Sequence, residues 1–295
     1  MFTHSICSYK QRGNYGNNSY RGNCSGFIIK DFIESFMMNK RGLFVDPSMG
    51  GGTSRDVAQE LGIRYTGLDL HQGFNLLRDD LLTAIGEESN CIWWHPPYWD
   101  MIKYSGQQWG EPNKWDLSQL NLNDFIEALE LSIMNIHDAC ETNGHYGILM
   151  GNLRRNGSYY NLSSMVERLA PAKLVDEIIK TQHNCTSDSN TYHHTLIRIA
   201  HEKLLVFRKT KSNKAVSLLG IINQRTDSML TITWRAAVRR TLQGHQSLKL
   251  DAIYLALEPY ANSRSNNHWK EKIRQVLQNS NFFTRLDVGL YTLAE

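Results

Sequence analysis

Two short segments of this chain contain residue types that suit binding of a small ligand and positioning of a reacting group. The first is Val45–Thr53, where Asp-Pro-Ser-Met is followed by three glycines and a threonine. It follows the apolar run Gly42–Val45 and precedes a helical pattern over Ser54–Leu61, which predicts a turn between a buried strand and a helix. Glycines let the backbone approach a ligand, with helix N–H groups pointing at it. Because no lysine follows the glycines, we expect a nucleoside site rather than a pyrophosphate loop.

The second segment is Trp94–Trp99, with the sequence Trp-His-Pro-Pro-Tyr-Trp. It follows the apolar run Cys91–Trp94, which indicates another buried strand. The two prolines fix two φ angles and remove two N–H donors, so this edge is rigid and its carbonyls are free to accept hydrogen bonds. Tyr98 presents a flat ring beside them. These features together suit the binding of an exocyclic amino group on a planar ring.

Further apolar segments predict the elements that position the two motifs. A strand is expected over Tyr65–Asp69, a long amphipathic helix over Asn123–Cys140 and a strand over Tyr146–Met150. Strands that alternate with helices predict an α/β fold with an open sheet. In such a sheet, ligands bind beyond the carboxyl ends of the strands, and both motifs fall there.

The sequence Asp46–Gly52, followed by His95–Tyr98, resembles the S-adenosylmethionine-dependent DNA amino-methyltransferases, which modify adenine N6 or cytosine N4. The resemblance covers roughly residues 9–209 and implies a Rossmann-like class I methyltransferase sheet with helices on both faces. It implies S-adenosyl-L-methionine as the cofactor. It also implies cofactor contacts by Asp46, Pro47, Ser48, Gly50, Gly52 and Thr53, and catalytic positions for His95, Pro96, Pro97 and Tyr98. The family usually has Asp, Asn or Ser where this chain has His95.

The resemblance places residues outside the two motifs at the cofactor as well. Asp69 is expected to accept hydrogen bonds from both ribose hydroxyls, and the alternative is a solvated acid at a strand end. Asp79 and Asp80 stand where the family often has an acidic residue at the adenine amino group, and the sequence does not separate the two. Asp79 is the candidate, and it is equally interpreted as a helix N-cap. Residues 9–26 are rich in Gly, Asn, Ser and Tyr and resemble the loop that closes over the methionine end, with a flexible terminus as the alternative. The candidates in that loop are Tyr20, Arg21, Gly22 and Asn23.

The implied reaction is methyl transfer to an exocyclic nitrogen of a base that is flipped out of DNA. The side chain of His95 and the carbonyl of Pro96 would accept the two hydrogens of that nitrogen, drawing it towards tetrahedral geometry, while Tyr98 stacks on the base. An imidazole accepts a hydrogen bond only when neutral, so we expect activity to fall below about pH 6.5. The alternative is a structural His95, with Pro96 alone holding the amine.

Adenine N6 is the expected target, and cytosine N4 is the alternative. Family members with Asp or Asn at the position of His95 mostly act on adenine and those with Ser on cytosine, and histidine belongs to neither group. His95 lies only 49 positions after Asp46, so target recognition must follow the second motif, as in several adenine enzymes. An RNA or protein-glutamine methyltransferase and a non-catalytic DNA-binding regulator are the other classes that the motifs allow.

The end of the chain has a different charge balance from the rest. Residues 208–295 contain 14 Lys and Arg against 6 Asp and Glu, whereas residues 1–207 contain 18 and 23. Helical patterns over Trp234–Leu242, over Leu248–Leu257 with Pro259 ending it, and from about Ser265 precede a hairpin signal at Asp287–Gly289. Three helices and a hairpin resemble a winged helix, whose third helix enters the major groove.

We therefore expect a methyltransferase domain over residues 1–209, a linker over 210–228 and a winged-helix-like DNA-binding domain over 229–295. Basic side chains at the rim of the sheet and on or beside the third helix are the candidate phosphate contacts. They are Arg154, Arg155, Arg264, Lys270, Lys272 and Arg274. A basic solvated face without a nucleic-acid partner is the alternative.

Composition and residue spacing also give expectations for membrane contact, metal binding and partners. The longest apolar runs are shorter than the ~20 residues that span a bilayer, and the first residues lack a signal-peptide core, so we expect a cytoplasmic protein without membrane contact. Five widely spaced cysteines and a histidine pair, His193–His194, without a third ligand predict no metal site. Double-stranded DNA is the expected partner, and a second copy of the chain and a restriction nuclease stay open.

Overall fold

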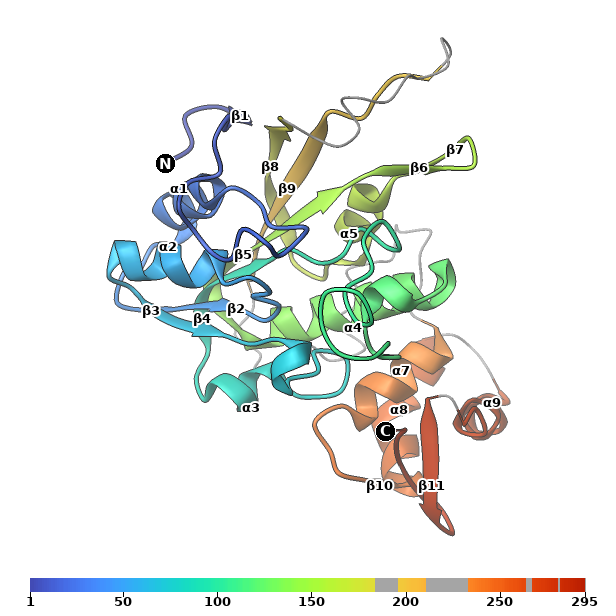
Figure 1. The fold of residues 1–295 in the computed structure, drawn as a ribbon. Helices are drawn as coiled ribbons and strands as arrows, with labels where there is room; N and C mark the ends of the chain where they lie inside the picture. Colours follow the sequence, from blue (N-terminus) through green and yellow to red (C-terminus); the bar gives the residue numbers. More distant parts are fainter. Residues whose placement is uncertain (184–195, 211–232, 264–266, 281, 295) are drawn as a thin grey trace.

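Seven strands form one central sheet in the computed structural model, which describes residues 1–183, 196–210, 233–263, 267–280 and 282–294 (Figure 1). The strand order is β1-β8-β9-β5-β4-β2-β3, and β9 alone in this sheet runs antiparallel to its neighbours. The strands are β1 (Ile6–Ser8), β2 (Leu43–Asp46), β3 (Arg64–Gly67), β4 (Ser89–Trp94), β5 (Cys140–Gly151), β8 (Lys173–Thr181) and β9 (His201–Arg208). The predicted α/β fold with a Rossmann-like sheet is confirmed.

Helices cover both faces of this sheet because successive side chains of each buried strand point to opposite sides. Phe44 of β2 packs with α1 (Gly26–Phe36) and α2 (Thr53–Leu61). Its neighbour Val45 packs on the other face, in the core formed with α4 (Leu122–Ala139) and α5 (Leu162–Leu169). The short helix α3 (Leu81–Ile85) contributes Leu81 to the same core as α4.

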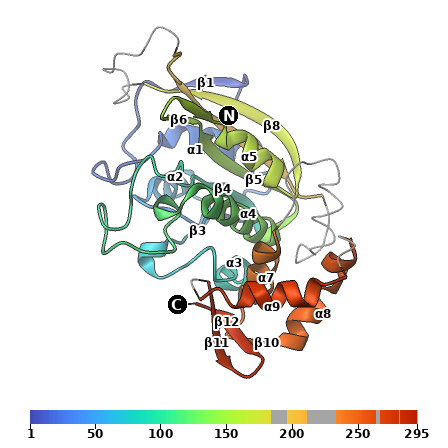
Figure 2. The same ribbon diagram turned by 90° about the vertical axis from the view of Figure 1, so that its right-hand side faces the viewer.

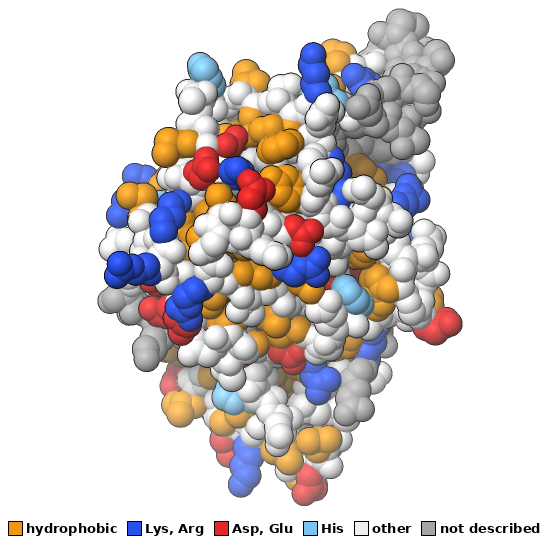
Figure 3. Space-filling model, turned by 60° about the vertical axis from the view of Figure 1, so that its left-hand side comes forward, with side chains coloured by type: hydrophobic (Ala, Val, Ile, Leu, Met, Phe, Trp, Pro, Cys, Tyr) orange, Lys and Arg blue, Asp and Glu red, His pale blue; other side chains and the backbone are white. Residues whose placement is uncertain are grey.

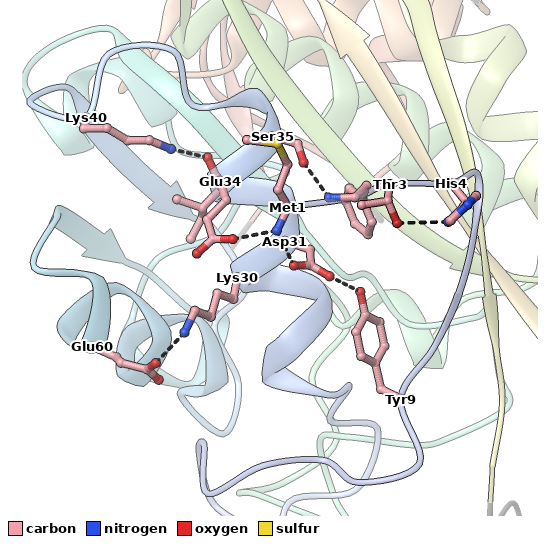
Figure 4. Close-up of polar contacts among 12 residues, drawn as sticks. Met1, Thr3, His4, Tyr9, Lys30, Asp31, Glu34, Ser35, Lys40 and Glu60 are labelled. Carbon is pink, nitrogen blue, oxygen red and sulfur yellow. Dashed lines mark hydrogen bonds and ion pairs between the residues drawn. The ribbon is translucent and has the colours of Figure 1, made fainter.

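The first residues of the chain are fixed on the outer side of α1 (Figure 4). The amino group of Met1 binds the carboxylates of Asp31 and Glu34 at 2.6 and 2.5 Å. Tyr9 donates its hydroxyl hydrogen to Asp31 at 2.5 Å. These contacts hold the strand β1 at the sheet edge, beside β8, and lead the chain into the loop that precedes α1.

A pair of short strands extends from the end of β5. β6 (Leu153–Arg155) and β7 (Ser158–Tyr160) form a two-stranded hairpin that projects from the body (Figure 1). The hairpin turn is formed by Asn156 and Gly157, both at positive φ, which matches the right-handed twist of the flanking strands.

The C-terminal part consists of three helices and a small antiparallel sheet of order β10-β12-β11. Its elements are α7 (Trp234–Leu242), β10 (Leu248–Lys249), α8 (Leu250–Ser263), α9 (Trp269–Leu277), β11 (Phe283–Asp287) and β12 (Leu290–Leu293). The expected end of a helix at Pro259 is wrong, because α8 continues to Ser263. Proline removes the hydrogen bond to the carbonyl four residues earlier, and Leu255 at that position is 74% exposed, so water can replace the lost donor.

The C-terminal part packs against α4 through both apolar and ionic contacts (Figure 2). Leu131 and Met134 of α4 share a core with Ala237 and Leu242 of α7. Basic side chains of α7 also pair with acids of α4: Arg235 with Asp124 and Glu127, Arg239 with Glu127, and Arg240 with Asp138. Part of the positive charge of residues 208–295 therefore neutralises acids of the body.

No helix among the described residues combines the length and apolar character needed to cross a membrane.

Candidate active site

The cavity that holds both sequence motifs lies beyond the carboxyl ends of β2 and β4. The cavity has about 910 Å³ of empty space, including the part that is open to solvent. The glycine turn after β2 forms one side, and the ends of β3 and β4 form others. Two loops, around residues 20–24 and 104–117, and the segment 74–77 complete the wall. Asp46, Pro47, Ser48, Gly50, Thr53, Asp69, His95 and Pro97 are the motif residues that line it.

The glycine turn is shaped by positive φ angles and by the loop that packs on it. Gly50 and Gly52 have φ of +47° and +82°, a region that residues with a Cβ rarely adopt. A Cβ on Gly50 would lie 2.9 Å from Cε1 of Tyr20, and one on Gly51 would lie 2.8 Å from Nδ2 of Asn23. Gly52 itself does not line the cavity. It is the N-cap of α2 and, as a glycine, makes no side-chain capping hydrogen bond.

The segment 9–26 reaches the cavity through its residues 20–24. The Asn17 N–H donates to the carbonyl of Gly51 at 2.8 Å, which joins the loop to the glycine turn. Tyr20, Gly22 and Asn23 line the cavity as predicted from the resemblance. Arg21 does not: its side chain is exposed, and its N–H donates to Oε1 of Gln108 at 2.6 Å. The two loops that flank the opening are therefore connected to each other.

Two carboxylates hold the turn in place. Asp46 is buried and accepts hydrogen bonds from the Ser48 N–H at 3.0 Å and from the Ser54 hydroxyl at 2.5 Å. Its burial raises the pKa of this carboxyl to about 7. Asp69, at the end of β3, accepts from the Gly50 N–H at 2.8 Å. Both acids thus fix the glycine turn while facing the same cavity.

Thr53 provides a polar atom that the protein does not satisfy. Its Oγ1 is buried without a hydrogen-bond partner among the described residues, and Thr53 lines the cavity at the start of α2. A buried hydroxyl without a partner is unfavourable by about 1–3 kcal/mol, so such groups are usually satisfied by a ligand or water. The helix N-terminus around Thr53 favours an anionic ligand group.

The interpretation of Asp79 as a helix N-cap is wrong, and the structure places its side chain away from the cavity lining. Its carboxylate accepts from the Asn75 N–H at 2.7 Å, and Asp79 does not line the cavity. The N-cap of α3 is Asp80, whose side chain accepts from the Thr83 N–H at 2.7 Å. Because Asp79 closes a turn onto the backbone of residue 75, the polar side chain that reaches the cavity from this segment is that of Asn75.

Several lining residues come from loops without a motif and were not among the predicted cofactor contacts. Phe74, Leu76 and Leu77 give the cavity an apolar side, and Trp109 and Trp115 come from the polar loop after the second motif. The sequence signal that could have indicated these five residues was their aromatic or apolar character in loops that contain acidic residues. Asn135 of α4 holds the segment in place by donating to the carbonyls of Leu76 and Asp79 at 2.9 and 2.7 Å.

A second, adjoining cavity of about 510 Å³ of empty space lies on the other side of the His-Pro-Pro-Tyr motif. Pro96 and Tyr98 line this second cavity, whereas Pro97 lines the first. Four residues border both cavities: Gly22, Asn23, His95 and Tyr104. The motif therefore stands between two adjacent cavities, and His95 faces both.

His95 is held by a short series of hydrogen bonds. Its Nε2 lies 2.9 Å from the hydroxyl oxygen of Tyr98, which in turn donates to Oε1 of Glu202 at 2.8 Å. Burial lowers the pKa of His95 to about 4, so the imidazole is neutral at pH 7. The ring of Tyr98 packs on Gly151, where a Cβ would lie 2.4 Å from its Cε2. Tyr98 is thus fixed at both its ring and its hydroxyl.

The basic residues predicted to contact DNA lie in two separate places. Arg154 and Arg155 are on β6, where Arg154 lies over the ring of Tyr159 at 5.0 Å and Arg155 pairs with Asp100 at 2.5 Å. On α9, Lys270, Lys272 and Arg274 are exposed, while Ile273 between them is buried. Arg264 and the histidines 193 and 194 lie outside the described residues. Among the described residues, no group of three His, Cys, Asp or Glu side chains is placed to hold a metal ion.

Comparison with known proteins gives distant structural likenesses only. No family model matches the sequence, and no curated protein matches it significantly. Among solved structures, TrmN from Thermus thermophilus is 11% identical with a TM-score of 0.36, over 64% of this chain and 50% of its own. This chain therefore spans only half of that protein's length.

Two further structures come from DNA modification systems. A provisionally assigned DNA modification methylase from Thermus thermophilus, crystallised with S-adenosyl-L-methionine, is 16% identical with a TM-score of 0.30, over 56% of this chain and 74% of its own. The modification subunit of a provisionally assigned type I restriction enzyme from Vibrio vulnificus is 14% identical with a TM-score of 0.38, over 66% of this chain and 46% of its own. With TM-scores below 0.5, these structures are too distant to assign an activity to this chain.

Proposed function

We propose that this protein transfers a methyl group from S-adenosyl-L-methionine to an exocyclic amino group of a base in DNA, with adenine N6 as the target. The observation that supports this proposal most directly is the meeting of two cavities at His95. The cavity of the glycine turn suits the cofactor, and the cavity bordered by Pro96 suits the base. Methyl transfer needs its two reactants in adjacent sites that open onto each other, and such placement supplies much of the acceleration.

The residues of the first cavity fit the proposed cofactor. The glycine turn lets the cofactor approach the backbone closely, and the carboxylate of Asp69 suits its ribose hydroxyls. The apolar side at Phe74 suits its adenine ring, and the unsatisfied hydroxyl of Thr53 suits its carboxylate. When bound, this cofactor supplies an electrophilic methyl group on sulfur, whose S–C bond breaks with its electron pair as a bond to nitrogen forms. Asp46, buried beneath the turn, favours a cation nearby, because a positive charge stabilises its ionised form.

The second cavity provides acceptors for the target amine. The backbone at Pro96 has no N–H, and its carbonyl can accept one amine hydrogen. A neutral His95 accepts the other, and it takes the proton that the nitrogen loses as the methyl group is gained. Since the pKa of His95 is about 4, the imidazolium releases this proton to water at pH 7. Tyr98 borders the same cavity with a ring fixed by Gly151.

The C-terminal part supports DNA as the substrate. The order α7, β10, α8, α9, β11, β12 and the sheet order β10-β12-β11 are those expected of a winged helix, which we propose for residues 229–295. Lys270, Lys272 and Arg274 lie on the exposed side of α9, where they would meet phosphates. On the face shown in Figure 3, basic and acidic side chains are interspersed, so that face offers DNA no single broad basic surface.

The experiment that tests this function measures methyl incorporation from labelled S-adenosyl-L-methionine. Purified protein is incubated with unmodified genomic DNA, total RNA and a protein lysate in separate reactions, and the nucleosides are then identified by mass spectrometry. We expect N6-methyladenine in DNA. Incorporation only into RNA or protein would overturn the substrate class, and N4-methylcytosine would overturn the base.

A set of variants separates the active site from general folding. His95→Ala removes one acceptor of the amine and is expected to lower kcat about 10²-fold, by analogy with the loss of one transition-state hydrogen bond. Arg41→Ala, at an exposed position before β2, is the matched control and should keep full activity. His95→Ala with near-normal turnover would show that Pro96 alone holds the amine.

A further inference from the structure

The hydrogen bonds behind His95 continue to a buried ion pair that no sequence motif indicated. Glu202 of β9 accepts the Tyr98 hydroxyl hydrogen on Oε1 and pairs through Oε2 with Nζ of Lys180 at 2.5 Å. Both charged side chains are mostly buried, at 9% and 12% exposed. They lie opposite each other in the register of β8 and β9. The sheet itself therefore positions the acid behind the motif.

The direction of each hydrogen bond in this series follows from the groups at its end. An ionised carboxylate only accepts, so the Tyr98 hydroxyl must donate to Glu202. The oxygen of Tyr98 then accepts from His95, which requires the hydrogen of the neutral imidazole to be on Nε2. Nδ1 of His95 is left with its lone pair, and it has no protein hydrogen-bond partner among the described residues.

Charges around this series keep Glu202 ionised. Burial alone would raise the pKa of Glu202, but the charge of Lys180 and the hydrogen bonds from Lys180 and Tyr98 bring it below its ordinary value. The other titratable groups that act on His95 or Tyr98 are the hydroxyl of Tyr104 and the thiol of Cys24. Burial raises the pKa of both groups, so neither is charged at pH 7.

We propose that Tyr98 and Glu202 are positioning residues that hold His95 in its Nε2–H tautomer, so that Nδ1 serves as the acceptor for the target amine. This inference rests on the function proposed above. His95 then offers a hydrogen-bond acceptor of fixed orientation, as Asp, Asn or Ser does at this position in the DNA amino-methyltransferases that the sequence resembles. This arrangement also gives the hydroxyl of Tyr98 a role that its ring cannot fill, because the hydroxyl makes the hydrogen bond that fixes the tautomer of His95.

Nitrogen NMR of the histidine side chains tests the tautomer without any substrate. In protein labelled with ¹⁵N, the His95 signals are identified by their loss in His95→Gln. We expect a protonated, pyrrole-like Nε2 and an unprotonated, pyridine-like Nδ1. Tyr98→Phe removes the acceptor on Nε2, so the two tautomers should become mixed. A His95 with the hydrogen on Nδ1 in the unaltered protein would overturn the proposal.

Glu202→Gln provides the sharper test, because an amide can donate as well as accept. Its NH₂ group can donate to the oxygen of Tyr98, which frees the hydroxyl to donate to Nε2 and allows the Nδ1–H tautomer. We expect that tautomer to appear in the NMR spectrum and kcat to fall about 10²-fold, with the KM for S-adenosyl-L-methionine unchanged. Glu202→Asp keeps a carboxylate and should restore the Nε2–H signal.

Glu177→Gln is the matched control for this variant. Glu177 of β8 forms a second ion pair between these two strands, with Lys203 of β9, but this pair is more exposed and is not connected to His95. Its substitution should leave the His95 signals and kcat unchanged. An Nε2–H tautomer in a protein that transfers no methyl group would overturn the proposed function and leave only the assignment of the tautomer standing. Methyl transfer by a Glu202→Gln variant whose His95 NMR signals are unaltered would overturn this inference and leave the proposed function standing.

Discussion

Arg239 of α7 forms a buried ion pair with Glu127 of α4, with its Nη1 3.0 Å from Oε1 and both side chains only 3% exposed. Glu127 also binds Nε of Arg235 at 2.6 Å, so one carboxylate satisfies two arginines. Arg239 lies in addition over the ring of Trp115, which lines the cofactor cavity. The C-terminal part is thus connected through this cluster to the wall of the active site.

Removing the carboxylate of this cluster should strongly destabilise the protein. Glu127→Gln leaves Arg239 charged and buried without a counter-ion, which we expect to lower the free energy of unfolding by about 3–5 kcal/mol. Urea denaturation measures the change. Arg274→Gln breaks an exposed pair with Glu271, whose side chains are 49% and 60% exposed, and should change it by less than about 1 kcal/mol. Equal decreases in the free energy of unfolding of the two variants would contradict the idea that burial makes the Glu127 ion pair the more important one.

This cluster also shows where the sequence misleads. The positive balance of residues 208–295 suggested nucleic-acid contact, yet Arg235, Arg239 and Arg240 pair with acids of α4. Charge counting cannot separate a basic surface from a buried interface, because the partners are about 110 residues away in the chain. Among the described residues, the exposed basic side chains of α9 belong to the part of that balance that remains available to DNA.

The strands and the two motifs were predictable for a local reason. A buried parallel strand is a short apolar run, and the glycine turn and the His-Pro-Pro-Tyr edge each consist of consecutive residues. Glu202 could not be found in this way, since its position behind His95 depends on the pairing of β8 with β9. Asp79 was misassigned because two adjacent acids differ only in the turn that each one closes.

The pH dependence of turnover should follow the low pKa of His95. The expectation from an unperturbed imidazole was a loss below about pH 6.5, but burial lowers the pKa of His95 to about 4. The neutral, accepting form therefore persists down to about pH 5, and kcat at saturating cofactor should stay level from pH 8 to that point. A fall in kcat centred near pH 6.5 would contradict the buried environment. His95→Asn, which does not titrate, is the control for other groups.

Asp46 should make stability depend on pH in the opposite sense to a salt-bridged acid. Its pKa is about 7 in the folded protein and near 3.8 when unperturbed, so the folded state holds a proton that the unfolded state releases between these values. Stability is therefore lost as pH rises from about 4 to 7. Relative to the unaltered protein, Asp46→Asn should gain about 2–3 kcal/mol between pH 5 and pH 8. Asp251→Asn, at the exposed start of α8, should show no such trend.

Binding of duplex DNA should weaken with salt through the cations of α9. Lys270→Ala and Arg274→Ala each remove one candidate phosphate contact and should each reduce the slope of log K against log salt by about 1, with affinity lowered for all sequences alike. Fluorescence anisotropy at several salt concentrations measures both effects. Lys30→Ala, which breaks a pair with Glu60 between α1 and α2, is the control and should leave the slope unchanged. An unchanged slope in the α9 variants would contradict groove binding by this helix.

The glycine turn allows backbone strain to be separated from crowding at the ligand site. Gly50→Ala places a Cβ 2.9 Å from Cε1 of Tyr20 at a φ of +47°, so the loop over the cavity must move. Gly62→Ala, at the C-cap of the same helix, has a φ of +64° but no atom within 4 Å of the added Cβ. Each substitution should lower stability by about 1 kcal/mol from the positive φ. Only Gly50→Ala should also weaken binding of S-adenosyl-L-methionine, by at least about tenfold in calorimetry, because its Cβ displaces the loop that forms the site. Equal affinities in the two variants would place the ligand away from the turn.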